Sequence, residues 1–154
     1  MIKTDEASLA VLNSLIMICY DGQFGYEMAA STIADMELSR LLGEIGAQRM
    51  KFADDLVARV RTLRSDPPKR GTTGGAIHRT WMEIRADQSN ARTHAVLAEC
   101  ERAEDISVKA YRAALQTGDL DEQTRDLIQQ QYEQVQLAHD RVRQLRDDPR
   151  YAWR

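Results

Sequence analysis

The helical periodicity of this chain breaks between about residues 64 and 92, and this break restricts the possible folds more than any other feature. On each side of the break, apolar residues recur every three or four positions through two long stretches, which is the pattern of amphipathic helices. A short turn joins the helices within each pair, and the long interrupted segment joins the two pairs. The chain therefore predicts a four-helix bundle with one long crossover between its second and third helices.

The crossover itself contains two kinds of sequence. Pro67 and Pro68 end the second helix, because a residue that precedes proline is pushed out of the helical conformation. A loop rich in glycine and threonine follows, and residues 76–86 then have the apolar spacing of a short amphipathic helix. One long crossover is typical of ferritin-like bundles. We therefore expect an all-α, ferritin-like four-helix bundle whose crossover carries a short extra helix. The first long helix is expected over about residues 5–33 and the second from a short turn near residues 34–35 to about residue 63. The third is expected over about residues 93–116, and the fourth from the turn near residues 118–121 to about residue 146.

The turn between the last two long helices carries capping residues. Gly118 is the expected C-cap of the third long helix, because glycine adopts the left-handed conformation at helix ends. Asp119 or Asp121 is the expected N-cap of the fourth, because a carboxylate there accepts hydrogen bonds from free backbone N–H groups.

Length and composition point to one domain. At 154 residues the chain can bury a core without disulfides or metals. Hydrophobic residues make up 43% and charged residues 29%, which is ordinary for a helical protein. The net charge of −3 provides no basic surface, so no nucleic-acid partner is expected. We expect a single domain over residues 1–146 and a C-terminal tail over residues 147–154.

The N-terminal segment does not predict export. Asp5 and Glu6 stand where a signal peptide carries positive charge. The apolar run of residues 9–20 contains Asn13 and Ser14 and is shorter than a bilayer-spanning helix, so no membrane partner is expected. The two cysteines lie far apart and lack the paired spacing of zinc or redox sites. These features predict a bacterial, cytoplasmic protein.

The first helix has a wide apolar face. One stripe consists of Leu9, Leu12, Ile16, Cys19, Tyr26 and Ala30, and a second of Val11, Leu15, Ile18, Gly22 and Gly25. A face of this width indicates burial on two sides, one against the bundle and one against another subunit. We therefore expect an oligomer, a homodimer formed through this helix. The two glycines are expected to let a neighbouring helix approach closely.

The metal ligands of a di-iron bundle are incomplete in this chain. Such a bundle takes one Glu from each of two helices and a Glu-x-x-His motif from each of the other two. The second helix contains no histidine, and Arg49 and Phe52 stand where the Glu and His of one motif would fit. In the fourth helix His139 is preceded at i−3 by Gln136, so the other motif is half present.

Two interpretations of the remaining polar layer stay open. A guanidinium repels divalent metals and binds carboxylates, so we expect Arg49 to pair with Glu101 or Glu104 in place of a metal. The expected hydrogen-bonding neighbours of this pair are Gln48, Tyr132 and Gln136. The alternative is a mononuclear site for iron or manganese built from Asp21, Glu104 and His139. The first interpretation requires no cofactor and predicts no catalytic residue.

Segments along most of the chain resemble one known family. These segments are LNSLI at 12–16, DG at 21–22, GY at 25–26, GAIHRTWM at 75–82, ECERAED at 99–105, KAY at 109–111 and HDRVR at 139–143. They resemble the small bacterial ferritin-like four-helix-bundle proteins catalogued as a domain of unknown function, over about residues 9–146. The resemblance implies the ferritin-like fold and no established activity. A more distant likeness to rubrerythrins and bacterioferritins matches Glu104 and His139 to metal ligands, whereas Arg49, Phe52 and Gln136 depart from that pattern.

Two hypotheses for function follow. The first, which we favour, is a non-enzymatic, stress-associated helical protein that acts through self-association or a protein partner. It rests on the wide apolar face of the first helix and on the missing catalytic set. The second is a ferritin-like metal-storage protein or di-metal oxidoreductase with a degenerate or mononuclear site, which rests on the architecture and the remaining carboxylates.

Overall fold

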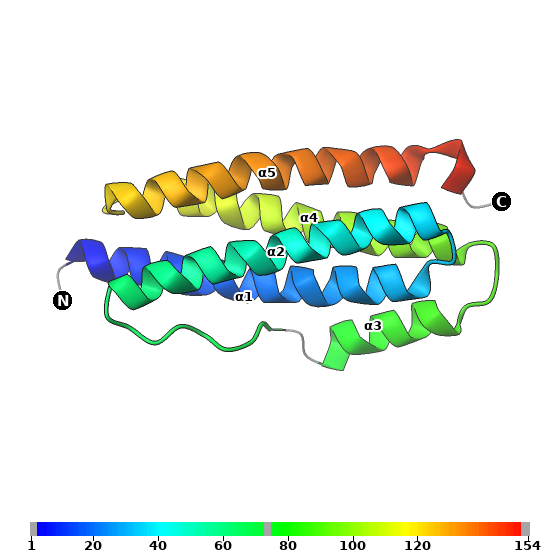
Figure 1. Cartoon of the computed structure of the whole chain (residues 1–154), viewed down its shortest axis with the longest axis horizontal. Helices are drawn as coiled ribbons and strands as arrows, with labels where there is room; N and C mark the ends of the chain where they lie inside the picture. The colour runs from blue at the N-terminus through cyan, green and yellow to red at the C-terminus, as the bar shows by residue number, and fades with distance from the viewer. Residues whose placement is uncertain (1–2, 73–74, 152–154) are drawn as a thin grey trace.

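Four long helices form a bundle, and a fifth, short helix lies along its outside (Figure 1). The computed structural model describes residues 3–72 and 75–151. Its helices are α1 (Lys3–Thr32), α2 (Met36–Thr62), α3 (Gly75–Ala86), α4 (Arg92–Leu115) and α5 (Glu122–Asp147), followed by the 3-10 helix η1 (Pro149–Tyr151). Short turns join α1 to α2 and α4 to α5, and the segment that contains α3 joins the two pairs. The predicted all-α, ferritin-like bundle with a helix-bearing crossover is confirmed.

Aspartate side chains begin two of the long helices. Asp35 accepts a hydrogen bond from the Leu38 backbone N–H at 3.0 Å, and Asp121 accepts one from the Thr124 N–H at 2.9 Å. The prediction of Asp121 as an N-cap is correct. The prediction for Gly118 is wrong, because α4 ends at Leu115 with Gln116 as its C-cap.

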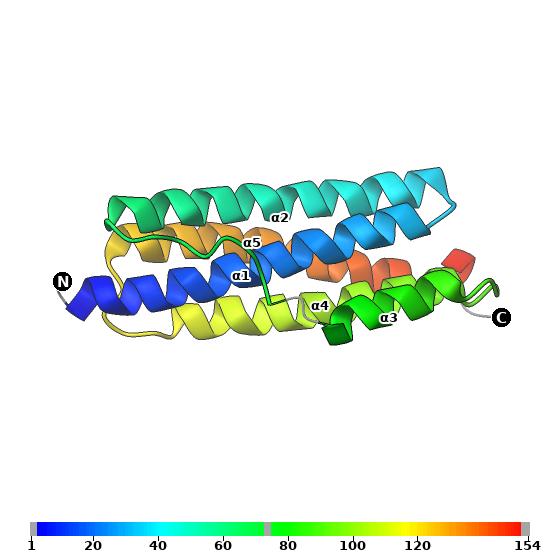
Figure 2. The same ribbon diagram turned by 90° about the horizontal axis from the view of Figure 1, so that it is seen from below.

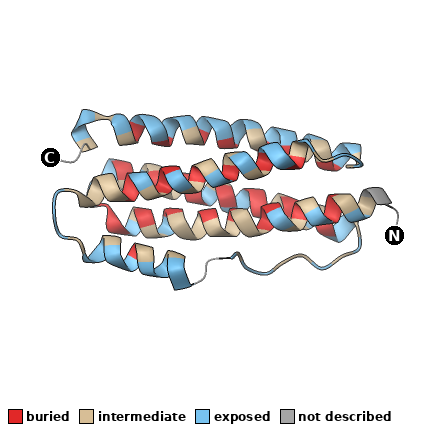
Figure 3. Cartoon of the chain, turned by 180° about the vertical axis from the view of Figure 1, so that it is seen from behind, coloured by how far each residue is buried: buried red, intermediate tan, exposed pale blue. Residues whose placement is uncertain are grey.

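The core fills the inward faces of the four long helices, as the red bands in Figure 3 show. Toward one end it consists of residues such as Leu12, Leu56 and Ile128, each fully buried. Toward the other end, Leu42 and Leu97 take part in a second buried cluster. Polar residues are also buried in the interior, among them Arg49, Glu104 and Gln131.

The crossover covers part of α1 and α4 (Figure 2). The Asp21 carboxylate of α1 accepts a hydrogen bond at 2.7 Å from the Thr72 backbone N–H and a second bond from the Thr72 hydroxyl. Trp81 of α3 is only 2% exposed and packs with the core. At the far end of α3, Arg85 donates a hydrogen bond to Ser31 of α1 at 2.8 Å. The crossover is therefore attached to the bundle at both of its halves.

The glycines of α1 face different neighbours. A Cβ atom on Gly22 would lie 3.5 Å from Cγ of Arg49 in α2, and one on Gly25 would lie 4.0 Å from the Trp81 ring of α3. Both glycines therefore let a large side chain of a neighbouring helix lie close to the α1 backbone, as the sequence predicted.

The length of α1 changes one expectation from the sequence. The apolar run of residues 9–20 is too short to span a bilayer, but it is part of a longer helix, and the stretch Asp5–Thr32 is long and apolar enough to cross one by length and composition. Core helices of soluble bundles and signal sequences meet the same criterion. In this structure α1 contributes Leu12, Leu15 and Ile16 to the core, each at most 1% exposed.

The C-terminal segment continues past the predicted domain boundary. Helix α5 ends at Asp147, and after its C-cap Asp148 the chain forms η1. Tyr151 of η1 packs against the core cluster that contains Leu145. The remainder of the predicted tail, residues 152–154, lies outside the described residues, and so does the expectation of a loose or docked Trp153.

Candidate functional site

An arginine and a glutamate form an ion pair in the interior of the bundle. Arg49 stands near the middle of α2 and Glu104 near the middle of α4. Nη2 of Arg49 lies 2.7 Å from Oε1 and 3.0 Å from Oε2 of Glu104. The two side chains are 2% and 0% exposed. A charged pair is tolerated there because each charge is compensated by the other at hydrogen-bonding distance.

Tyr26 of α1 completes this cluster. Its hydroxyl donates a hydrogen bond to Oε1 of Glu104, and its ring centroid lies 5.8 Å from the Arg49 guanidinium carbon, within cation–π range. Burial, together with the negative charge of Glu104, raises the pKa of Tyr26 well above its usual value. The phenol therefore stays protonated and donates a hydrogen bond to Glu104.

The Arg49 guanidinium stays charged in this setting. Burial alone would lower the pKa of Arg49, but the charge of Glu104 and the hydrogen bond to it outweigh burial and raise that pKa. A weaker hydrogen bond of 3.4 Å joins Nε of Arg49 to Gln48. We call Tyr26, Arg49 and Glu104 the central triad.

The structure selects among the partners that the sequence left open. Glu104, and not Glu101, pairs with Arg49. Glu101 instead pairs with Arg146 of α5 and lies 3.8 Å from Nε of Arg143. Of the expected neighbours, Gln48 contacts Arg49, whereas Tyr132 and Gln136 hydrogen-bond to each other at 2.9 Å on the exterior.

A second buried polar group links all four long helices. The Tyr111 hydroxyl of α4 donates to Oε1 of Gln131 in α5 at 2.7 Å and lies 3.3 Å from Sγ of Cys19 in α1. Nε2 of Gln131 donates to the backbone carbonyl of Phe52 in α2 at 3.2 Å. The sequence analysis missed this group, although Tyr111 and Gln131 are polar residues at inward helical positions, which was a usable signal.

The three candidate metal ligands have separate partners. Asp21 bonds Thr72 of the crossover, Glu104 belongs to the central triad, and His139 of α5 lies 2.6 Å from the Asp105 carboxylate of α4. Within residues 3–72 and 75–151, no three His, Cys, Asp or Glu side chains form a group that could hold a metal ion. The described arrangement does not bring the predicted mononuclear site together.

The donor chemistry of the bundle centre also does not fit the di-metal site that the fold family implies. Such a site needs several carboxylates directed at the metals. Here the Glu104 carboxylate accepts hydrogen bonds from the Arg49 guanidinium and the Tyr26 phenol, and the positive charge of Arg49 lies beside it. We therefore derive no reaction step through a metal at this position.

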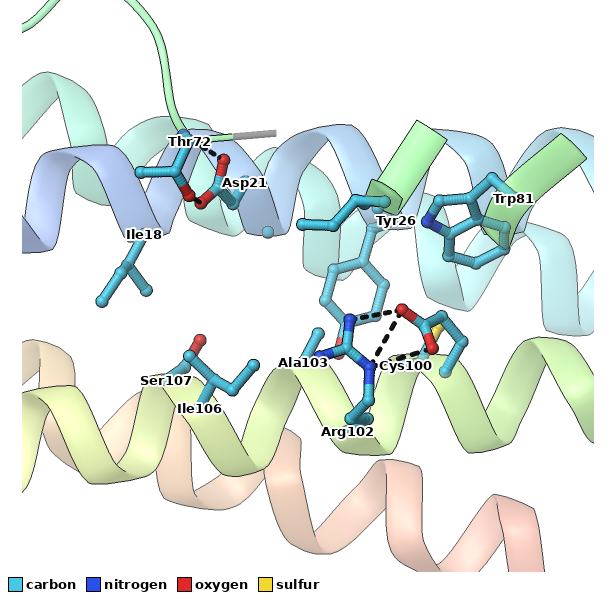
Figure 4. Close-up of a pocket in the computed structure, with 14 residues that line it drawn as sticks. Ile18, Asp21, Tyr26, Thr72, Trp81, Cys100, Arg102, Ala103, Ile106 and Ser107 are labelled. Carbon is cyan, nitrogen blue, oxygen red and sulfur yellow. Dashed lines mark hydrogen bonds and ion pairs between the residues drawn. The ribbon is translucent and has the colours of Figure 1, made fainter. Parts of the chain in front are cut away.

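A cavity of about 160 Å³ lies beside the central triad, between α1, α3 and α4 (Figure 4). Tyr26 and Cys100 form part of its wall, and Trp81 of α3 borders it. Ile18 of α1 and Ile106 of α4 line this space from opposite helices (Figure 4). The sequence analysis did not predict the cavity, because it depends on where the crossover places α3.

Comparisons with known proteins agree with the architecture. A family model described as "Domain of unknown function (DUF2383)" matches residues 7–117. A solved structure of a mutant of Mycobacterium smegmatis Dps1 matches with a TM-score of 0.76 at 16% sequence identity, covering 96% of this chain and 99% of that chain. At this identity the match shows the shared ferritin-like fold alone. No curated protein matches this chain.

Proposed function

The chain belongs to the DUF2383 family of domains of unknown function, and we propose that it is a non-enzymatic ferritin-like protein that acts by associating with a second copy of itself. The observation that carries this proposal is the buried ion pair of Arg49 and Glu104. It supports a structural role for the bundle centre, where other ferritin-like proteins bind metal.

The central triad supports a non-catalytic interior for a second reason. The Glu104 carboxylate accepts hydrogen bonds from both Arg49 and Tyr26, so the charge at its centre is compensated within the triad. Burial raises the pKa of Tyr26 and thereby keeps the phenol neutral. No member of the triad is available as a general base at neutral pH, and each is nearly inaccessible to solvent.

The surface of α1 supports self-association. Only 39% of its most apolar 18-residue window is buried within this chain. Met17, Tyr20, Phe24 and Met28 recur at three- and four-residue steps on α1, and all four are partly exposed. Apolar side chains that remain partly exposed along one helix face are typical of an interface, because burying them against a second copy is favourable.

The test of association uses analytical ultracentrifugation of the full chain. We expect a dimer that dissociates on dilution and is weakened by Met17→Lys and by Phe24→Lys. The matched control is Leu137→Lys on α5, where the side chain is already 63% exposed. A wild-type chain that is monomeric at all concentrations would contradict the proposal, and so would equal dimerisation by the wild type and both α1 variants.

A metal measurement tests the alternative function. We expect protein purified without added metal, and then exposed to Fe(II) in air, to hold no stoichiometric iron or manganese. We also expect a chelator to leave the melting temperature unchanged. One metal per chain, with loss on His139→Ala or Asp21→Asn, would instead support metal storage or oxidation.

The bacterial source, the cytoplasmic location and the association with stress stay predictions. A bacterial, cytoplasmic and stress-associated protein is what the sequence hypothesis expects. Abundance measurements after oxidant or starvation treatment, combined with cell fractionation, would check this expectation.

A further inference from the structure

The cavity between α1, α3 and α4 has the features of a ligand site, and this inference goes beyond the proposed self-association and does not depend on it. We propose that the cavity binds a small, neutral aromatic molecule with a single hydroxyl group, of about the size of phenol. The inference rests on the volume of the cavity, its apolar and aromatic lining, and the two residues with polar groups, Ser107 and Trp81, that line it.

Small residues create the space. Gly22 and Gly25 of α1 and Ala103 of α4 line the cavity and place little or no side chain in it. A Cβ atom on Gly25 would still be 4.0 Å from the Trp81 ring, its nearest neighbour outside α1. The void therefore lies between the α1 backbone and α4, with the α3 tryptophan along its edge (Figure 4).

Size and lining favour an aromatic molecule. A cavity of roughly 150 Å³ with an apolar lining accepts a ligand as small as benzene. The cavity here measures about 160 Å³, is partly open to solvent and has a mainly apolar lining. Ile18 and Ile106 provide apolar walls, and Trp81 provides an aromatic one. Aromatic rings gain additional attraction from a neighbouring ring in edge-to-face or offset contact.

The charges at the rim favour a neutral ligand. Nε of Arg102 is hydrogen-bonded to the Glu99 carboxylate at 3.0 and 3.1 Å, so these charges compensate each other. The Asp21 carboxylate accepts bonds from Thr72. A charged ligand would have to displace one of these partners, whereas a neutral one leaves both in place.

Two polar groups inside the cavity favour a hydroxyl on the ligand. Ser107 of α4 is 4% exposed and Trp81 is 2% exposed. Both residues line the cavity, and in Figure 4 the Ser107 hydroxyl points into it. A ligand that fills the cavity needs a polar atom of its own to serve as hydrogen-bond partner to such a group. A phenolic hydroxyl both donates and accepts, so it can satisfy either group.

Calorimetric titration of phenol into the full chain tests the proposal, with benzene and cyclohexanol as comparison ligands. We expect one saturable phenol site per chain with a dissociation constant on the order of 0.1 to 1 mM. Cyclohexanol has the same hydroxyl without the aromatic ring, and we expect it to bind at least several-fold more weakly. If phenol does not saturate a site at a concentration of about 10 mM, the proposal is wrong. The proposal is also wrong if cyclohexanol binds with the same affinity as phenol.

Variants locate the site. Ala103→Leu fills the cavity and should weaken phenol binding at least tenfold, whereas Ala98→Leu, at an exposed position of the same helix, should leave it unchanged. Ser107→Ala should reduce phenol affinity about fivefold, the contribution of one hydrogen bond, and should not change benzene affinity. Thermal melts check that each variant is folded. Phenol binding that survives in folded Ala103→Leu would place the ligand elsewhere and overturn the assignment.

Discussion

Gly46 of α2 and Tyr26 of α1 approach so closely that a Cβ atom on Gly46 would lie 3.0 Å from the Cβ atom of Tyr26. This approach brings the Tyr26 ring within 5.8 Å of the Arg49 guanidinium, which is one helical turn from Gly46 on the same helix. Tyr26 in turn reaches Glu104 on α4. The central ion pair therefore depends on the tight packing of α1 against α2 as well as on its own charges.

Alanine substitutions at two glycines of α2, Gly43 and Gly46, should change the stability of the protein in opposite directions. A Cβ atom on Gly43 would lie 3.9 Å from the Cβ atom of Ala30, an ordinary van der Waals contact. Gly43→Ala should stabilise the protein by up to about 1 kcal/mol, because alanine favours helix more than glycine does. Gly46→Ala should instead destabilise it by about 1 to 3 kcal/mol, because Tyr26 must move. Urea unfolding measures both, and stabilisation by Gly46→Ala would contradict this packing.

Breaking the central ion pair should be costly. Arg49→Ala leaves the Glu104 charge buried without its partner, so we expect it to reduce the free energy of unfolding by about 3 to 5 kcal/mol. Arg49→Met combined with Glu104→Gln should cost less than Arg49→Met alone, because no charge is stranded and the new amide oxygen can still accept from Tyr26.

An exposed ion pair on the same helix is the control for this experiment. Lys51 pairs with Asp55 at 2.7 Å, and its side chain is 70% exposed. Lys51→Met should change the unfolding midpoint far less than Arg49→Met, because solvent screens an exposed pair. Similar effects of the two substitutions in guanidinium unfolding would show that Arg49 is not held as the structure describes.

Helical periodicity explains why the fold was predictable and why the site was predictable only in part. The stripes placed Arg49 and Glu104 on inward faces, and opposite charges on inward faces predict a pair. Periodicity does not separate Glu101 from Glu104, because residues three apart on a helix share a face. Which glutamate pairs with Arg49 depends on α5, because Arg146 of α5 forms an ion pair with Glu101.

The crossover limits prediction for a different reason. It has no continuous period, so the sequence did not indicate that Thr72 would lie over Asp21. The sequence therefore places Asp21 in the polar layer of the bundle interior, whereas in the structure its carboxylate accepts hydrogen bonds from Thr72 of the crossover. The cavity beside Trp81 also depends on this path, because a void arises from the spacing of elements and leaves no pattern in any one of them.

The two cysteines should be unreactive in the folded protein. Burial raises the pKa of Cys19 to about 11, and it also raises the pKa of Cys100. The thiolate is the reactive form, so almost none is present at pH 8. A thiol-specific reagent should label neither cysteine within minutes in native protein and should label both in urea. Rapid native labelling of Cys100 would indicate that the cavity it borders opens widely to solvent.

Stability should fall at low pH partly through Asp121. Burial alone would raise the pKa of this carboxyl, but hydrogen bonds from Thr124 and Ser8 and the charge of Arg59 outweigh burial and lower it from 3.8 to about 2. The Arg59 Nη2 atom lies 2.7 Å from Oδ1 of Asp121.

The lowered pKa of Asp121 determines how stability changes with pH. The folded state binds fewer protons at Asp121 than the unfolded state does between about pH 4 and pH 2. Its contribution, about 2 kcal/mol, is therefore fully present above about pH 5 and is lost as the pH falls through about 2.

Urea unfolding at a series of pH values should show this loss in the wild type and a smaller one in Asp121→Asn, which keeps a capping oxygen. Asp126→Asn, at an exposed position of the same helix, should leave the profile unchanged. An NMR titration that places the Asp121 midpoint at or above 3.8 would contradict the assignment.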